Sequence, residues 1–258
     1  MKKHIKQFLF SLLLSDYIRI IIGYIRWLYF FKLKRNFKLI NNTPNSIENT
    51  VIYNSSVFNK FPLTDFIMKR MKWLLNAISS VEILNQSSSF LLIGSRTENE
   101  ILFLKGKFNN PNINVIDLIS YSPWIELQDM HDMKFKNNSF DCIICGWTIN
   151  YSSNIQRAID EIIRVSKKEC IIAFGFEHTD SVTPKIDYKR INHISDLERI
   201  KINTTSELMS YFQARNNISA ELIFNHNALM SEISIEEKVK KTGLASSQVM
   251  ALILLKKS

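Results

Sequence analysis

Two neighbouring stretches of the sequence end an apolar run in a residue that can contact a nucleotide. FLLIG at 90–94 ends in Gly94, and a short polar turn then leads into an expected helix at 100–107. NVID at 114–117 ends in the carboxylate of Asp117. A glycine lets the backbone approach a ligand closely, and a carboxylate at a strand tip can accept hydrogen bonds from both hydroxyls of a ribose. The spacing is therefore typical of a loop and an acid that bind a nucleotide together.

The elements that must position these residues alternate between strands and helices. The run at 90–94 is apolar throughout, which suits a parallel strand covered on both faces. Ser153 or Asn154 can cap a helix whose isoleucines, such as Ile155 and Ile159, line one face. The alternation predicts an α/β fold with a doubly wound, mostly parallel sheet. The expected strands are 90–94, 114–117, 140–147, 169–176, 219–227 and 247–257.

The final expected strand predicts how the sheet ends. It is apolar at every position from Val249 to Leu255, so we expect it to be central in the sheet. A last strand that is inserted antiparallel between its neighbours would give the sheet a terminal hairpin.

Cysteine usage indicates a reducing compartment, and we place the protein in a cytoplasm. Cys142, Cys145 and Cys170 are too few for a disulfide framework. Side chains three apart on a strand point to opposite faces, so Cys142 and Cys145 cannot share a metal. We expect small core residues and no metal there.

The formal net charge of +9 is concentrated near the N-terminus. Residues 1–40 carry nine lysines and arginines against a single acid, Asp16, and the remaining chain is close to neutral. A basic nucleic-acid-binding protein is therefore not indicated. We expect residues 1–40 to form a basic amphipathic helical arm, 41–60 a linker, and 61–258 the main domain.

Three placements are open to this arm, because its run at 8–35 is the most apolar part of the chain. Asp16, Arg19 and Arg26 interrupt the run, which disfavours a membrane span, and no small-residue cleavage site marks a signal peptide. A helix lying on an anionic leaflet fits the apolar bulk, the interfacial aromatic residues and the basic ends. A helix packed on the domain or on a second subunit is the alternative.

The stretch from Asn114 to Phe176 resembles the class I S-adenosylmethionine-dependent methyltransferases of the small-molecule type. That family has an acid at the end of its second strand, another acid before a phrase of the form lPF.dnSFD, and a helix ending in E..RVLK. Asp117, Asp129, MKFKNNSFD and EIIRVSKKE occupy those places in this chain. The resemblance covers roughly 89–176 and the final hairpin, and it implies a Rossmann-like fold with S-adenosylmethionine as cofactor.

The resemblance also implies the residues that contact the cofactor. Asp117 would accept the ribose hydroxyls, and Asp129 would accept the adenine amino group with Met130 beside the ring. Trp147 would pack on the adenine or wall the substrate side. Both acids also occur as simple turn formers, Trp147 could belong to the core, and Asp132 could replace Asp129 in a shifted register. The full expected set is Gly94, Ser95, Arg96, Asp117, Leu118, Asp129, Met130 and Trp147.

The polar turn after the first strand departs from the family pattern, which has an acid and then G-x-G-x-G. Leu92 stands where the acid is expected, and Arg96 and Glu98 stand where the later glycines are expected. Glu98 would repel the carboxylate of the cofactor, whereas the Arg96 guanidinium could pair with it in a bidentate manner. The turn therefore lies in the right place for a nucleotide and has unusual residues for one.

Catalytic residues are less clearly marked, because in-line methyl transfer depends mainly on alignment. Glu177 and His178 follow the fifth strand, where the family often places substrate-facing groups, and His178 is the candidate base, with a solvated loop histidine as the alternative. His131 lies in the expected adenine loop, which disfavours a metal role. The charged segment 180–217 is expected to be irregular and to cover the acceptor.

Two classes of function remain open. The first is a methyltransferase acting on a small-molecule or glycan/lipid-linked acceptor in the cytoplasm, where its arm associates with the inner face of the membrane. The second is a methyltransferase-like binding or scaffold protein that has lost catalysis, which the altered turn favours. A nicotinamide-dependent dehydrogenase is a distant third, because the turn lacks its glycines and the expected strand hairpin is typical of methyltransferases.

Overall fold

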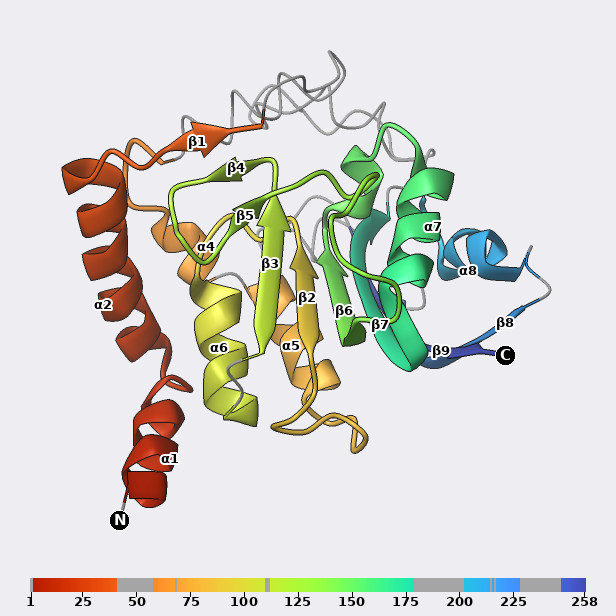
Figure 1. Cartoon of the computed structure of the whole chain (residues 1–258), viewed down its shortest axis with the longest axis horizontal. Helices are drawn as coiled ribbons and strands as arrows, with labels where there is room; N and C mark the ends of the chain where they lie inside the picture. Colours follow the sequence, from red (N-terminus) through yellow and green to blue (C-terminus); the bar gives the residue numbers. More distant parts are fainter. Residues whose placement is uncertain are drawn as a thin grey trace.

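A seven-stranded sheet forms the centre of the protein in the computed structural model (Figure 1). The structure describes residues 2–40, 58–67, 69–109, 112–178, 202–213, 215, 217–227 and 247–258. The strands of the sheet are β2 Phe90–Ile93, β3 Ile113–Asp117, β5 Glu126–Leu127, β6 Phe140–Gly146, β7 Ser166–His178, β8 Ile218–Asn227 and β9 Ser247–Lys257.

The strand order confirms the expected fold class and its ending. The order is β5-β3-β2-β6-β7-β9-β8, in which the first five strands are parallel. Strand β9 lies between β7 and β8 and is antiparallel to both. Its continuous apolar run is explained by this position, because both of its faces and both of its edges are covered.

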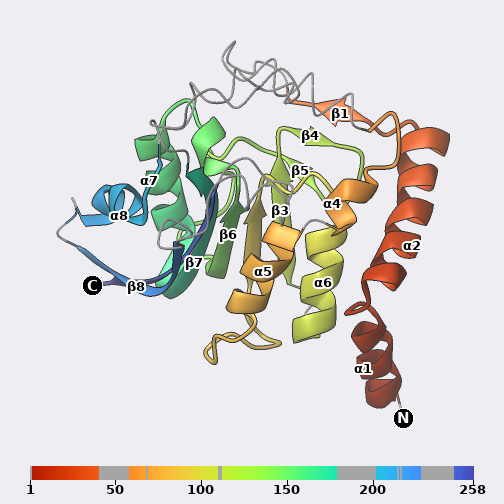
Figure 2. The same ribbon diagram turned by 180° about the vertical axis from the view of Figure 1, so that it is seen from behind.

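Helices cover both faces of the sheet (Figures 1 and 2). Helices α5 (Lys69–Ile78) and α6 (Asn99–Phe108) pack with Cys142 of β6 on one face. Helices α7 (Ile155–Val165) and α8 (Thr205–Gln213) pack with Cys145 on the other. The two cysteines therefore face opposite layers, as the strand spacing predicts.

Local signals account for both α7 and α8. At the start of α8, Thr204 Oγ1 accepts a hydrogen bond from the Glu207 amide at 3.1 Å, and Glu207 Oε2 accepts one from the Thr204 amide at 3.1 Å. The Asn154 side chain caps α7 by accepting a hydrogen bond from the backbone of Arg157 at 3.1 Å, as expected. The expectation that 180–217 is irregular is wrong for Thr205–Gln213, which forms α8 because Leu208 and Phe212 bury against the core. Residues 179–201 lie outside the described part of the chain.

One connection in the sheet is unusually short. Parallel neighbours normally need a crossover of a dozen or more residues, usually a helix. Strands β3 and β5 are joined by residues 118–125 alone, which contain only the two-residue strand β4 (Ile119–Ser120), paired with β1 (Lys38–Leu39). No crossover helix therefore covers this edge of the sheet beside α6.

The arm, residues 1–40, occupies that edge. It forms α1 (Lys2–Leu12), α2 (Asp16–Trp27) and a π-helical segment, η1 (Leu28–Leu33), and both views show α2 beside α6 (Figures 1 and 2). Trp27 is buried with Ile119 and Tyr121 of the short connection, and its indole nitrogen donates to the Phe58 carbonyl at 3.1 Å. The arm thus packs on the domain, which is one of the expected placements.

Two arginines fasten α2 to the start of α6, Arg19 fully buried and Arg26 partly buried. Arg19 is 1% exposed, and its Nε donates to Asn99 Oδ1 at 2.8 Å. Arg26 binds the carboxylate of Glu98 with two nitrogens, at 2.5 and 2.9 Å, and lies 3.4 Å from the ring centre of Trp124. Glu98 is completely buried, so its charge depends on Arg26 and on the Ser122 hydroxyl that donates to it.

Replacing Arg26 by alanine is expected to destabilise the protein by about 3 kcal/mol, because it leaves the Glu98 carboxylate buried and unpaired. Urea or guanidinium unfolding measures this change. Adding Glu98→Gln to the same variant should recover part of the loss, since the bare charge is gone. Lys34→Ala, an exposed cation on the same arm, is the matched control and should change stability by less than about 0.5 kcal/mol. Equal losses in the two single variants would contradict the role of the ion pair.

Candidate functional site

The carboxyl ends of three adjacent strands bring together three of the expected residues. Gly94 follows β2, Asp117 ends β3, and Trp147 follows β6. Ligands of open α/β sheets bind at this edge. We call it the carboxyl edge of the sheet.

The backbone of the turn 94–98 requires glycine at its first position only. Gly94 has φ of +77°, and a Cβ built there would lie 2.2 Å from Thr148 Oγ1. Its amide donates to the Ile116 carbonyl at 2.9 Å, which fixes the turn to β3. Leu92, which stands where the family has an acid, is buried in the core instead.

The side chains of the turn are tied to neighbouring elements. Ser95 Oγ donates to Glu100 Oε2 at 2.8 Å, and Arg96 Nη2 lies 2.7 Å from Asp65 Oδ1 of helix α4 (Leu63–Ile67). Glu98 is held by Arg26, as described above. The charges that replace glycines in this turn are thus balanced within the protein, and Glu98 is neutralised rather than left to repel a ligand.

Asp117 is positioned to accept hydrogen bonds at the carboxyl edge. Its Oδ1 accepts from the Ile119 amide at 3.1 Å. Burial raises the pKa of Asp117 to about 6, while backbone hydrogen bonds and the nearby Arg96 charge act in the opposite direction. Leu118, next in the chain, packs with the aromatic cluster under the arm.

Asp129 makes local contacts that the sequence did not predict. His131 donates its backbone amide to Asp129 Oδ1 at 2.9 Å, and its ring Nδ1 lies 2.5 Å from the same oxygen. Burial raises the pKa of Asp129, but the hydrogen bonds from His131 outweigh it and hold the pKa below its ordinary value. The other His131 nitrogen contacts Ser152 Oγ at 2.6 Å. His131 therefore has a structural role, and the Met130 side chain beside it is buried in the core.

Trp147 lies on the far side of the carboxyl edge from Asp117. Its φ is +54°, an unfavourable value for a bulky residue, and its ring covers Gly175 of β7, where a Cβ would lie 2.6 Å from the ring. Its indole nitrogen donates to Gln248 Oε1 at 2.5 Å, and Arg70 stacks 4.9 Å from its ring centre. Trp147 also packs against the core cluster on this face of the sheet, so the expected alternatives of a core residue and of a wall on the substrate side both fit its position.

The candidate base lies at the end of a strand rather than in a loop. Strand β7 extends to His178, and Glu177 forms an ion pair with Arg70 at 2.6 Å. The side chain of His178 lies outside the described part of the structure.

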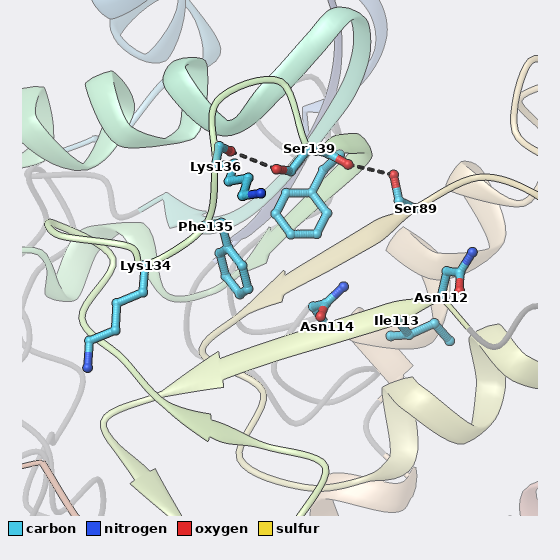
Figure 3. Close-up of a pocket in the computed structure, with 9 residues that line it drawn as sticks. Ser89, Asn112, Ile113, Asn114, Lys134, Phe135, Lys136 and Ser139 are labelled. Carbon is cyan, nitrogen blue, oxygen red and sulfur yellow. Dashed lines mark hydrogen bonds between the residues drawn. The ribbon is translucent and has the colours of Figure 1, made fainter.

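A cavity of about 530 Å³ lies at the opposite end of the sheet, where β2, β3 and β6 begin (Figure 3). Ser89 donates to the Ser139 carbonyl at its rim, at 2.8 Å, and Lys134 points away from it in the close-up. Because none of Gly94, Asp117 and Trp147 lines it, this cavity is separate from the carboxyl edge. Its lining residues are Ser89, Asn112, Ile113, Asn114, Lys134, Phe135, Lys136, Ser139 and Phe140.

Comparisons with known proteins agree with this geometry. Residues 104–174 match a family model described as a methyltransferase domain. This part of the chain is therefore similar to methyltransferase domains. A comparison with curated proteins found no match.

Solved structures share the fold of this chain at low sequence identity. A protein from Galdieria sulphuraria assigned as a sarcosine dimethylglycine methyltransferase is 13% identical, with a TM-score of 0.52, over 74% of this chain and 87% of that one. Phosphoethanolamine N-methyltransferase 2 from Haemonchus contortus is 12% identical, with a TM-score of 0.54, over 72% and 53%. The cyclase SpnF is 12% identical, with a TM-score of 0.52, over 72% and 80%.

The carboxyl edge fits the charge pattern of S-adenosylmethionine, the cofactor that the family resemblance implies. This molecule has a ribose and a zwitterionic amino-acid end. Asp117 offers a carboxylate for the ribose. Asp65 Oδ2 is buried and has no hydrogen-bond partner among the described residues, so it has unused capacity for a donor. Within the described residues, no group of histidine, cysteine and acidic side chains is arranged to hold a metal.

Sequence reasoning missed Asp65 and Glu100. Glu100 was assigned to the expected helix at 100–107, and Asp65 comes from a helix well before the turn. An acid in the first turn of α6 is the only local signal for Glu100. Neither residue belongs to the family phrase, so only the fold brings them to the turn.

Glu100 is expected to make stability depend on pH. Burial raises its pKa from 4.5 to about 7. Between these values the folded state keeps a proton that the unfolded state releases, so the stabilisation present below pH 4.5 is lost as pH rises through 7. Glu100→Gln should therefore stabilise the protein more at pH 8 than at pH 5, by at most about 3 kcal/mol, since one pKa unit corresponds to about 1.4 kcal/mol.

Chemical denaturation at the two pH values measures this difference. The matched control is Glu221→Gln, which removes an exposed carboxylate on β8 and should change stability by less than about 0.5 kcal/mol. A Glu100→Gln effect of the same size at pH 5 and pH 8 would contradict a proton held at this position.

Proposed function

We propose that this chain transfers a methyl group from S-adenosylmethionine to a small-molecule or glycan/lipid-linked acceptor. The observation that carries the proposal is the placement of Asp117 beside the Gly94 turn at the carboxyl edge of a methyltransferase fold. On this proposal Asp117 accepts the ribose hydroxyls and the turn receives the methionyl part. Ser95, Arg96, Leu118, Asp129, Met130 and Trp147 complete the proposed cofactor surroundings.

The chemistry is an in-line displacement at the methyl carbon. A lone pair of the acceptor forms the new bond to carbon, the sulfur–carbon bond breaks, and S-adenosylhomocysteine is released. Alignment supplies much of the rate, and an acceptor hydroxyl also requires a base to take its proton. His178, at the end of β7, is the proposed base for such an acceptor.

The acceptor side of the site lies toward β7. Trp147 walls it, and the Arg70–Glu177 pair stands next to Trp147. The Haemonchus contortus enzyme was solved with phosphomonomethylethanolamine and S-adenosylhomocysteine, which shows that this fold accommodates a phosphate-bearing acceptor.

Calorimetric titration with S-adenosylhomocysteine tests the cofactor site. We expect saturable binding that Asp117→Ala weakens by about tenfold or more, because a charged hydrogen-bond acceptor is lost. Glu169→Ala, which removes an exposed carboxylate near the start of β7, away from the carboxyl edge, is the matched control and should bind normally. Equal affinity of Asp117→Ala and the unmodified protein would contradict the assignment of Asp117.

The second candidate is a binding or scaffold protein without methyl transfer. The similarity to the cyclase SpnF favours keeping it, because the same fold is found in a protein named for another reaction. The replaced glycines of the turn favour it as well. A folded chain that binds no S-adenosylhomocysteine at millimolar concentration would make this the better description.

We also propose that the arm lies on an anionic membrane surface on the cytoplasmic side. The face of α1 and α2 that points away from the domain is apolar and open: Phe8 is 63% and Tyr17 79% exposed, while Arg19 and Trp27 on the opposite face are buried. Among the described helices, none is long and apolar enough to cross a membrane. The exposed apolar residues of this face are Ile5, Phe8, Leu9, Leu12, Leu14, Tyr17, Ile21, Ile25 and Leu28.

Charge favours a lipid surface over a second copy of the chain. Lys34, Arg35 and Lys38 are exposed next to the apolar face. Two arms of the same positive charge repel each other, whereas an anionic leaflet attracts basic residues by about 1 kcal/mol each. An acceptor linked to a lipid or a surface glycan would then be presented to a site that is already close to the membrane.

Co-sedimentation with vesicles of phosphatidylcholine and phosphatidylglycerol tests the membrane proposal. We expect binding that weakens at high salt, and the double variant Ile21→Asp/Ile25→Asp should lose it by about tenfold or more, because two apolar side chains no longer insert. Ile83→Asp, at a residue that is 55% exposed outside the arm, is the matched control. Unchanged sedimentation of the folded double variant would overturn this role of the arm.

A further inference from the structure

Helix α4 places one acid directly beside the turn of the proposed cofactor site. Both views show α4 above the first turn of α6 (Figures 1 and 2). Asp65 of α4 is 6% exposed, and its Oδ1 lies 2.7 Å from Arg96 Nη2 in the turn. The two residues thus form an ion pair at the carboxyl edge.

Half of the Asp65 carboxyl group is left without a partner. Its Oδ2 is buried and accepts no hydrogen bond in the described part of the chain. Burial raises the pKa of Asp65 even though the charges of Arg96 and Arg70 oppose the change. A buried carboxylate oxygen is costly unless a donor or a cation reaches it, so this oxygen indicates a missing cationic partner.

The other acids of this region do not compete for such a partner. Glu98 is already neutralised by the two bonds from Arg26. Glu100 accepts from Ser95 Oγ, and burial raises its pKa to about 7, so it is substantially protonated at neutral pH. Asp65 therefore supplies the negative charge next to Arg96 that a ligand can use.

Arg96 supplies the matching positive charge on the ribose side. Its side chain is 25% exposed, and its charge acts on Asp117, the proposed ribose acid. A positive and a negative group thus stand side by side at the end of the proposed nucleotide site. This arrangement is complementary to a zwitterion.

We propose that Asp65 and Arg96 together bind the amino-acid end of the cofactor, Asp65 through Oδ2 to the ammonium group and Arg96 to the carboxylate. The inference rests on the proposed function, since it assigns a subsite of the same cofactor. On this proposal, two side chains rather than a glycine-rich backbone bind the amino-acid end (the tail) of the cofactor. One of them, Asp65, comes from helix α4, outside the turn.

The surrounding contacts fix Asp65 for this task. The Asp65 carbonyl accepts from Asn99 Nδ2 at 3.4 Å, and Asn99 is itself held by Arg19 of the arm. The neighbouring Phe66 covers Gly23 of α2, where a Cβ would lie 2.2 Å from the ring. The position of Asp65 is therefore set by the interface between the arm and the domain.

The test compares two ligands that differ in the tail. S-adenosylhomocysteine carries the amino-acid end, and 5′-methylthioadenosine has the same nucleoside and sulfur without it. In calorimetric titrations, Asp65→Asn should weaken S-adenosylhomocysteine by about tenfold or more, because a charged contact is lost. It should leave methylthioadenosine within about twofold. Arg96→Gln should show the same selectivity, and Arg96→Lys should restore part of the affinity.

Each other outcome overturns the inference. Equal weakening of both ligands by Asp65→Asn would mean that the ion pair only holds the fold, and no weakening of either would exclude contact with the tail. Thermal melting of each variant identifies a folding defect, and Glu169→Gln, at an exposed acid near the start of β7, is the control for loss of a surface charge. An unmodified protein that binds methylthioadenosine but not S-adenosylhomocysteine overturns this inference alone, whereas one that binds neither overturns the proposed function as well.

Discussion

The ion pair between the partly exposed Arg26 and the fully buried Glu98 is the interaction on which the rest of the structure depends. Glu98 has no exposure to solvent, so its charge persists only because a guanidinium binds both carboxylate oxygens. Arg26 also stacks on Trp124, which belongs to the short connection between β3 and β5. One arginine thereby joins the arm, the turn and the edge of the sheet, and loss of any of these partners leaves a charge in an apolar site.

The Arg26–Glu98 pair explains how the altered turn can lie next to a ligand. A glycine-rich turn keeps side chains away from a bound nucleotide, and Arg96 and Glu98 would obstruct it if both pointed toward the ligand. Here Glu98 is engaged by Arg26, and Arg96 is engaged by Asp65 while still lying near Asp117. Only Gly94 keeps a backbone conformation that favours glycine, and Thr148 leaves no room for a Cβ at that position. The departures from the family pattern are compensated by side chains from outside the family phrase.

The sequence predicted the central sheet well because the signals for it are local. Continuous apolar runs located β2, β6, β7 and β9, and the spacing of Cys142 and Cys145 correctly predicted that they face opposite layers. Asp117 lies at a strand tip, as expected.

The partners of Glu98 and Asp65 could not be predicted, because each pair joins residues that are distant in the chain and leaves no periodic pattern. Helix α8 was missed because the charged composition of 180–217 outweighed two local signals, the Thr204–Glu207 capping pair and the i, i+4 spacing of Leu208 and Phe212. For the proposed cofactor residues, the sequence indicated the positions, while the contacts that set their charges came from the fold.

The position of α2 beside α6 has a consequence for biosynthesis. A chain emerges from the ribosome beginning at its N-terminus, so Arg26 is made 72 residues before Glu98 and well before Trp124. During that interval both faces of α2 are uncovered, the outer one that stays apolar and the inner one that later binds the domain. The helices of the arm are synthesised first, but they cannot pack on the domain until Glu98 and Trp124 have been made. The order of synthesis therefore differs from the order of packing. Long-range contacts of this kind slow folding, and a nascent arm that rests on an anionic surface would be kept from aggregating until its partners arrive.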